Sequence, residues 1–339
     1  MNGWQTLWFI LVGVLFSGYA ILDGFDLGVG ALHLMVREDR ERRIFLNAIG
    51  PIWDGNEVWL VTGGGALFAA FPEAYATVFS GFYLAFVLLL LCLIFRAVAI
   101  EFRGKRPMRW WRQAWDLSFS LSSVVSSLLL GVALGSIAWG IPLGADHEFA
   151  GGFFDLLKPY PLLLGLTTLA LFTMHGSIYL ALKTEGPLQD KLKRWARDAV
   201  VAFVLLYAVT TLATLLFVPH MLATIQAHPA LFLVPLASLL AIANIPRSLS
   251  RGREAQAFVS SCAALLSLMA LFGIGMYPDI VFSSPLPANS LDIANASSST
   301  TTLKIMALMA AIGMPLVLSY TAGIYWVFRG KVKLDSHSY

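Results

Sequence analysis

Apolar residues occur along this chain in long, nearly uninterrupted runs, instead of the alternation or the narrow stripe expected of a soluble domain. Most runs exceed the roughly 20 residues that an α-helix needs to cross a bilayer. The pattern therefore predicts an all-α integral membrane protein, one polytopic domain over residues 1–339 with about nine transmembrane helices. The predicted helices cover residues 4–36, 51–71, 76–100, 117–140, 160–182, 198–219, 229–244, 256–277 and 303–328.

Charge tests the two weakest of these runs. The run 51–71 contains acids and three consecutive glycines, and the run 229–244 is short with an internal proline. Lys and Arg concentrate in cytoplasmic loops, and with nine spans 20 of the 23 Lys and Arg fall in the gaps after spans one, three, five and seven and in the C-terminal tail. Removing either weak run would move whole basic clusters to the other face. The charge pattern therefore supports nine spans, with the N-terminus outside and the C-terminus cytoplasmic.

Composition narrows the class further. Hydrophobic residues make up 58% of the chain and charged residues only 13%, about half the charged fraction of a soluble domain. The first span has no basic segment before it and carries Asp23 and Asp26, so a cleaved signal peptide is not expected. The chain has no Walker motif for ATP and no CxxCH motif for covalent haem, and no nucleic-acid partner is expected.

Five acids lie within or at the ends of the first three predicted spans: Asp23, Asp26, Asp54, Glu57 and Glu101. Asp26 and Asp54 are each 11 residues from a cytoplasmic arginine, which at 1.5 Å per residue predicts a depth of about 16 Å for both. Residues three apart share a helix face, so Asp23 with Asp26 and Asp54 with Glu57 would form one acidic cluster if the two helices meet.

An ionisable residue at membrane depth is costly and usually has a function, and three functions are open here. Glu101 stands at the inner end of span three and would form the mouth of a polar path to the cluster, through which stepped carboxylates can pass protons. Alternatively, the acids pair with Arg96 or cap broken helices. The third possibility is a contact with a cofactor of another subunit.

Small and aromatic residues flank these acids. The spacing of Gly24 and Gly28 predicts close helix packing in lipid, as do the three glycines in span two, Gly63, Gly64 and Gly65. Trp53 and Trp59 are too deep for an interfacial aromatic belt. We therefore expect both tryptophans at a protein interface.

The six histidines are scattered over different spans and loops, without the paired spacing of a metal site. Only His33 and His175 lie within spans. Haem requires only one or two axial ligands, so the spacing of the histidines alone does not decide whether one of them binds haem. No metal site and no haem bound by this chain are expected.

Several strings together carry a resemblance that covers essentially the whole chain. They are "DGFDLGVG" in span one, "GPIWDGNEVWL" in span two, "GGGALFAAFPEAYATVFSGFY" leading into span three, and a tail ending in "HSY". The chain resembles subunit II of the cytochrome bd-type quinol oxidases, the cyanide-insensitive branch included. The resemblance implies a bacterial inner-membrane complex in which a partner, subunit I, carries haem b and haem d, oxidises quinol and reduces oxygen to water.

For this chain the resemblance implies two four-helix bundles plus a peripheral helix, and no haem. It places Glu101 and Asp54 on a cytoplasmic proton path with Asp26 and Asp23 nearby, and Trp59 near an oxygen route. Trp53, Asn56, Glu57 and Trp59 form the segment expected at the subunit interface or along the oxygen route. A small accessory subunit and a structural quinone or lipid are further expectations.

Two other functions compete with an oxidase subunit. A proton-coupled secondary transporter would use the same acids, and Gly63 to Gly65 could mark one of its broken helices, although no matching break occurs in the second half. A scaffold whose acids only pair and pack would lose assembly, and not turnover, when they are replaced.

Overall fold

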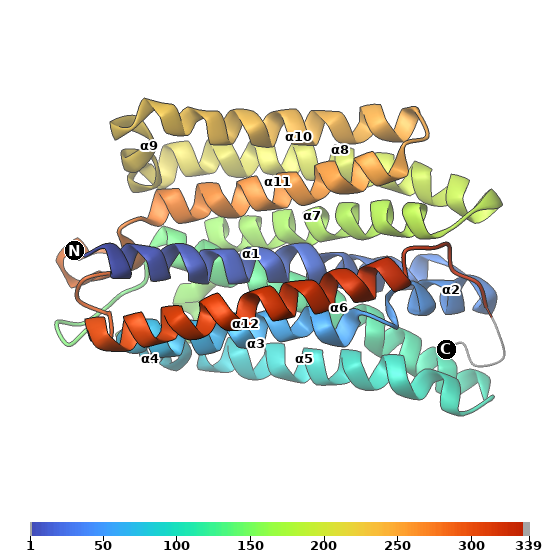
Figure 1. Ribbon diagram of the computed structural model, residues 1–339, viewed down its shortest axis with the longest axis horizontal. Coiled ribbons are helices and arrows are strands. Elements are labelled where there is room, and N and C mark those ends of the chain that lie inside the picture. Colours follow the sequence, from blue (N-terminus) through green and yellow to red (C-terminus); the bar gives the residue numbers. More distant parts are fainter. Residues whose placement is uncertain (1, 335–339) are drawn as a thin grey trace.

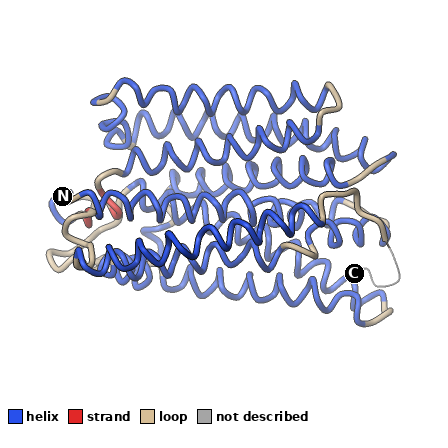
Figure 2. The backbone as a smooth tube through the Cα atoms, in the orientation of Figure 1, coloured by secondary structure: helices blue, strands red, loops and turns tan. Residues whose placement is uncertain are grey.

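The computed structural model of the protein describes residues 2–334 and shows an elongated bundle of long helices running along a common axis (Figure 1). Helix dominates the tube drawing, in which loops gather at the two ends and the strands form one short hairpin (Figure 2). The hairpin lies near the N-terminus, and α2 lies at the opposite end (Figures 1 and 2). The "HSY" tail, including His337, lies outside the described residues.

The helices and strands follow one another without a separate soluble domain in the described part of the chain. The long helices begin at capping residues in two clear cases: Asn2 forms a capping box with Gln5, and Ser299 accepts from the backbone of Thr302. The helices are α1 (Gly3–Leu32), α2 (Asp39–Ile49), α3 (Trp53–Ala70), α4 (Pro72–Gly81), α5 (Tyr83–Phe102), α6 (Arg109–Trp139), α7 (Pro159–Lys183), α8 (Gly186–Phe217), α9 (Ala223–Ala227), α10 (Leu233–Ser250), α11 (Glu254–Met276) and α12 (Thr300–Val327), and the strands are β1 (Asp279–Val281) and β2 (Leu291–Asp292).

The long helices form two groups of four. In the first group α1 packs against α3 and α6, and α5 packs against α6; in the second, α7 packs against α8 and α11, and α10 packs against α11. The groups are joined because α7 also packs against α1 and α6. α12 lies at the side, touching α1 and α3 (Figure 1). The expected architecture, two four-helix bundles plus a peripheral helix, is confirmed.

Eight helices of the described chain are long and apolar enough to cross a membrane. The predicted span that is not among these eight, 51–71, corresponds to α3, which has only 18 residues and is polar in its first two turns. The predicted span 76–100 begins inside α4 and runs through a break at Phe82 into α5. The predictions for spans four and six began too late, because α6 and α8 each start with a charged, still helical segment.

Two glycines explain how closely the bundles approach. A Cβ built on Gly28 of α1 would lie 1.8 Å from the backbone oxygen of Phe172 on α7, and one built on Gly176 would lie 2.5 Å from the backbone of Gly28. Only glycine, which has no Cβ, allows the two backbones to touch here. The crossing of α1 and α7 therefore depends on both glycines.

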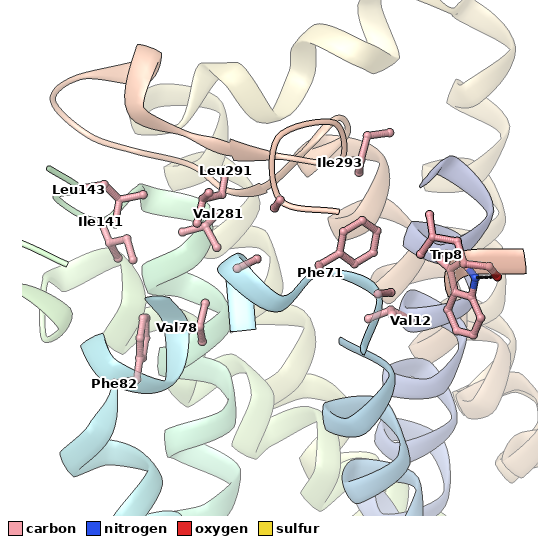
Figure 3. Close-up of a cluster of buried hydrophobic side chains, with 14 of the residues drawn as sticks. Trp8, Val12, Phe71, Val78, Phe82, Ile141, Leu143, Val281, Leu291 and Ile293 are labelled. Carbon is pink, nitrogen blue, oxygen red and sulfur yellow. Dashed lines mark hydrogen bonds between the residues drawn. The ribbon is translucent and has the colours of Figure 1, made fainter. Parts of the chain in front are cut away.

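At the end of the bundle near the N-terminus, the hairpin and the adjoining loops pack against the helices in a buried apolar cluster. It brings together Trp8 and Val12 of α1, Phe71 at the α3–α4 junction, and Val281 and Leu291 of the hairpin (Figure 3). The indole nitrogen of Trp8 donates to the backbone oxygen of Leu303 on α12 at 2.9 Å. This cluster holds one end of α12 in place, whereas the buried charges described next lie closer to the other end.

Candidate functional site

Two acids on one face of α1 begin the candidate site. Asp23 and Asp26 are separated by three residues, so their side chains point to the same side, and both are completely buried. α5 supplies the cation, Arg96, which is also completely buried. Its Nη1 donates to Asp23 Oδ2 at 2.8 Å and its Nη2 donates to Asp23 Oδ1. This two-pronged geometry is the strong form of a carboxylate–guanidinium pair.

Asp26 has a different partner, the amide of Asn56 on α3. Asn56 Nδ2 donates to Asp26 Oδ2 at 2.8 Å and to the backbone oxygen of Leu22 at 3.2 Å. Asn56 Oδ1 in turn accepts from the hydroxyl of Tyr325 on α12 at 2.9 Å. A single buried amide therefore links α1, α3 and α12.

Glu57 completes a group that we call the acid cluster: Asp23, Asp26, Asn56, Glu57 and Arg96. Glu57 Oε2 lies 3.5 Å from Arg96 Nη2, and its side chain is 20% exposed. The cluster thus holds three carboxyl groups against one guanidinium. Because burying net charge is costly, such a group is a favourable place to hold a proton.

Three buried polar atoms around this cluster make no hydrogen bond within the described residues: Asp26 Oδ1, Arg96 Nε and the hydroxyl of Tyr19. Buried polar groups nearly always have a protein or water partner. The cluster can therefore accommodate internal water, which would extend its hydrogen-bond network along α1 towards Tyr19.

The structure does not bring Asp54 into the acid cluster, and it interrupts the continuous rise from which the depth of Asp54 was predicted. The calculation treated residues 43–54 as one continuous rise, but α2 ends at Ile49, and α3 begins only at Trp53. Asp54 therefore lies in the first turn of α3 and is exposed on this chain. It remains one helical turn from Glu57 on the same helix.

Glu101 lies in the last turn of α5, half-buried. It is five residues beyond Arg96 on the same helix, at the end of the bundle where α2 lies. Its position relative to Arg96 agrees with a place at the mouth of a path, and its role there stays a prediction.

A second buried charge cluster, which the sequence analysis missed, lies close to Glu101. Asp116 of α6 is 1% exposed, and it accepts from Arg103 Nε at 2.5 Å and from Arg42 Nη1 at 2.7 Å, while His33 Nε2 lies 2.6 Å from its Oδ1. Arg103 also bonds the half-exposed Asp39 at 2.7 Å. The predicted span began at residue 117, one residue too late to include this acid among the buried ones.

The tryptophans and glycines of the sequence prediction occupy different surroundings. Trp53 packs against the buried cluster around α2, and the ring of Trp59 covers Gly18, where a Cβ would lie 2.2 Å from Trp59 Cε3. Both tryptophans are half-buried. Their expected place at a subunit interface stays a prediction.

Close packing is visible at three of the five predicted glycines. A Cβ on Gly24 would meet the ring of Phe172 at 2.8 Å, one on Gly63 would meet the ring of Phe16 at 3.0 Å, and Gly28 touches backbone. Gly64 and Gly65 have no neighbour of the described chain within 4 Å of such a Cβ. Any close packing at those two must come from outside this chain.

The two histidines within spans are both fully buried. His175 Nδ1 is hydrogen-bonded to Ser261 Oγ at 2.7 Å, its Nε2 to the backbone oxygen of Ile21 at 3.0 Å, and its ring stacks on Phe258. His33 uses Nε2 for Asp116. Both ring nitrogens of His175 are therefore engaged, whereas Nδ1 of His33 makes no hydrogen bond within the described residues.

Comparison with known proteins places this geometry in a family. Residues 4–328 match the family Cytochrome bd terminal oxidase subunit II. The chain is 38% identical to "Cytochrome bd ubiquinol oxidase subunit 2" of Bacillus subtilis, over 98% of both chains. It is 35% identical to "Cytochrome bd-I ubiquinol oxidase subunit 2" of Escherichia coli K12, over 97% of this chain and 95% of the relative.

The fold is also similar to a solved structure. A chain of "The structure of bd oxidase from Geobacillus thermodenitrificans" superposes with a TM-score of 0.80, covering 96% of this chain and 99% of that chain at 15% sequence identity. The family match and the full-length relatives agree with the resemblance read from the sequence. The chain belongs to the cytochrome bd terminal oxidase subunit II family.

Proposed function

We propose that this chain is subunit II of a terminal quinol oxidase in the bacterial cytoplasmic membrane, assembled with a haem-bearing subunit I that reduces oxygen to water. Relatives named as subunit 2 of ubiquinol oxidases align over nearly their whole length, which supports this assignment. They do not favour the alternative, a proton-coupled secondary transporter. An orientation with the N-terminus outside and the C-terminus cytoplasmic is part of the proposal and rests on the distribution of Lys and Arg.

The specific task of this subunit would be to conduct protons from the cytoplasm towards the partner. The observation that carries this proposal is the acid cluster itself, which holds three carboxyl groups and one buried guanidinium and in which buried polar atoms remain for water. Glu101 and the exposed Asp54 would collect protons at the inner end. Glu57, one turn beyond Asp54, would pass them to Asp26 and Asp23.

The haems and the quinol chemistry are assigned to the partner. When bound there, the haems supply electron transfer and oxygen reduction, while residues of this chain hold and move protons. The engaged ring nitrogens of His175 argue against an axial ligand at that position. The structural quinone or lipid and the small accessory subunit stay predictions.

The proton path is tested in the purified complex by Asp26→Asn, Asp54→Asn and Glu101→Gln, with haem content measured in each. We expect quinol oxidase turnover to fall about a hundredfold or more for an essential relay acid, in the range typical of lost proton transfer. Glu73→Gln is the matched control, because this exposed acid begins α4 at the other end of α3. Normal turnover in all three variants would refute the path, and loss of haem and partner together would favour the scaffold.

A further inference from the structure

Tyr325 makes a contact that is unusual for α12, because this helix otherwise touches little of the described chain. Most side chains of α12 are exposed, and only Leu303 and Met306 of its residues are buried. Tyr325 is half-buried, and its hydroxyl reaches the nearly inaccessible amide of Asn56 at 2.9 Å. The last long helix therefore has a direct polar link to the acid cluster, although it lies outside both four-helix groups.

The orientation of the Asn56 amide follows from its acceptors. The backbone oxygen of Leu22 can only accept, so it requires the NH₂ end of the amide, and the same NH₂ group donates to Asp26 Oδ2. Asn56 Oδ1 must then face the other way, into a region where it needs a donor. Tyr325 is that donor, and the amide is 2% exposed, so water does not replace the hydroxyl without rearrangement.

The surroundings of Tyr325 fix its ring independently of the hydroxyl. The ring lines a cavity of about 140 Å³ together with Tyr179, Phe258 and Phe328. Tyr179 is itself anchored, because its hydroxyl donates to the backbone oxygen of Ala48 at 2.8 Å. Replacing Tyr325 with Phe would therefore keep the ring in this wall and remove only the hydrogen bond to Asn56.

We propose that Tyr325 is a positioning residue for proton transfer at Asp26: its hydroxyl holds the Asn56 amide so that Nδ2 faces the buried carboxyl. This inference rests on the proposed function, because Asp26 must take part in proton delivery for its hydrogen-bonding state to affect turnover. Without the hydroxyl, Oδ1 of the amide becomes a buried acceptor without a donor, and the amide is held only through Nδ2, so its hydrogen bond to Asp26 is less firmly fixed. Proton transfer at Asp26 then becomes slower, while quinol binding in the partner is unaffected.

The test uses the complete oxidase complex with Tyr325→Phe, Asn56→Ser and the double variant. Turnover should fall about fivefold in Tyr325→Phe, as expected for the loss of one hydrogen bond, with the KM for quinol and the haem content unchanged. The solvent deuterium isotope effect on turnover should rise, because proton transfer becomes more rate-limiting. Tyr320→Phe is the control, since it removes the same hydroxyl from an exposed position on α12.

The double variant identifies the route of the effect. If Tyr325 acts through Asn56, Tyr325→Phe changes neither turnover nor the isotope effect further in the Asn56→Ser background. Additive losses in the double variant, or an unchanged isotope effect in Tyr325→Phe, would overturn the inference.

A separate measurement distinguishes failure of this inference from failure of the proposed proton path. If Asp26→Asn turns over like the wild type, Asp26 is not on the path and the part of the inference that concerns turnover falls with it. Thermal unfolding of the wild type, Tyr325→Phe, Asn56→Ser and the double variant then tests the contact between Tyr325 and Asn56 by itself. Non-additive changes in Tm support a direct interaction between Tyr325 and Asn56, and additive changes refute it.

Discussion

Replacing Asp116 with Asn removes the one anion that three buried or partly buried basic side chains share. Arg103, Arg42 and His33 all contact this carboxylate within 2.7 Å. An Asn side chain has nearly the same size, so packing is retained. Its amide, however, presents N–H groups to neighbours that are themselves donors. Arg42 loses its countercharge, and Arg103 keeps only its pair with the half-exposed Asp39.

The size of the effect follows from exposure. Removing one partner of a buried ion pair costs about 3–5 kcal/mol, because the remaining charge stays desolvated. The side chain of Arg42 is 18% exposed and can turn partly towards water, whereas Arg103 is only 3% exposed. We therefore expect Asp116→Asn to lower the free energy of unfolding by about 3 kcal/mol, the lower end of that range.

Asp39 provides a matched control, because it binds the same Arg103 at 2.7 Å but its side chain is 47% exposed. Exposed pairs contribute less than about 1 kcal/mol. A denaturant titration of the complex in mild detergent, followed by helical circular dichroism, gives both values. Equal losses for Asp116→Asn and Asp39→Asn, or a loss below about 1 kcal/mol for Asp116→Asn, would refute the reasoning from burial.

Three further predictions concern other parts of the chain. Gly28→Ala should prevent stable folding, because the new methyl group would overlap backbone of α7, whereas Gly64→Ala should leave the monomer intact; detergent-resistant folded yield compares the two. Arg96→Gln should destabilise the protein by about 3–5 kcal/mol by leaving Asp23 charged and unpaired, and adding Asp23→Asn should recover more than half of that loss in the same titration. Asp279, outside the membrane helices, has its pKa raised to about 6 by burial and by the facing carboxylate on β2, against about 3.9 in the unfolded chain. Protonation therefore favours the folded state, so the stability from this group is full below about pH 4 and is lost as the pH rises through 6. Asp279→Asn should raise the Tm at pH 7.5 and hardly change it at pH 4, and a larger gain at pH 4 would contradict the assigned pKa shift.

Hydrophobic runs were sufficient to predict the helical architecture, since a bilayer requires long apolar helices whatever their contacts. The same signal could not predict α2 or the early starts of α6 and α8. Those segments are charged and amphipathic, and their helical structure depends on packing and on continuation of a neighbouring helix. A calculation that assumes one continuous rise does not apply across such a segment, as between residues 43 and 54.

The candidate site was predicted only in part. The sequence identified Asp23, Asp26 and Glu57 as unusual because an acid within an apolar run is costly wherever it lies. The structure brings Asp23 and Glu57 to Arg96, and Asp26 to Asn56 of the same cluster. Asn56 was named only as part of a motif, and Tyr325 was not considered, because a tyrosine near the end of a span is common and carries no signal of its own. Contacts between residues 56 and 325 depend on tertiary structure alone.

That separation in sequence has a consequence for how the protein is made. α1, α3 and α5, which supply the charged members of the acid cluster, are synthesised within the first third of the chain, whereas Tyr325 emerges from the ribosome near the end. Until α12 inserts, Asn56 lacks the donor for its Oδ1 and Trp8 lacks the backbone acceptor at Leu303. Insertion of the final span therefore completes hydrogen bonds at both ends of the bundle at once, and a chain interrupted before α12 would leave the acid cluster without the donor to Asn56 Oδ1.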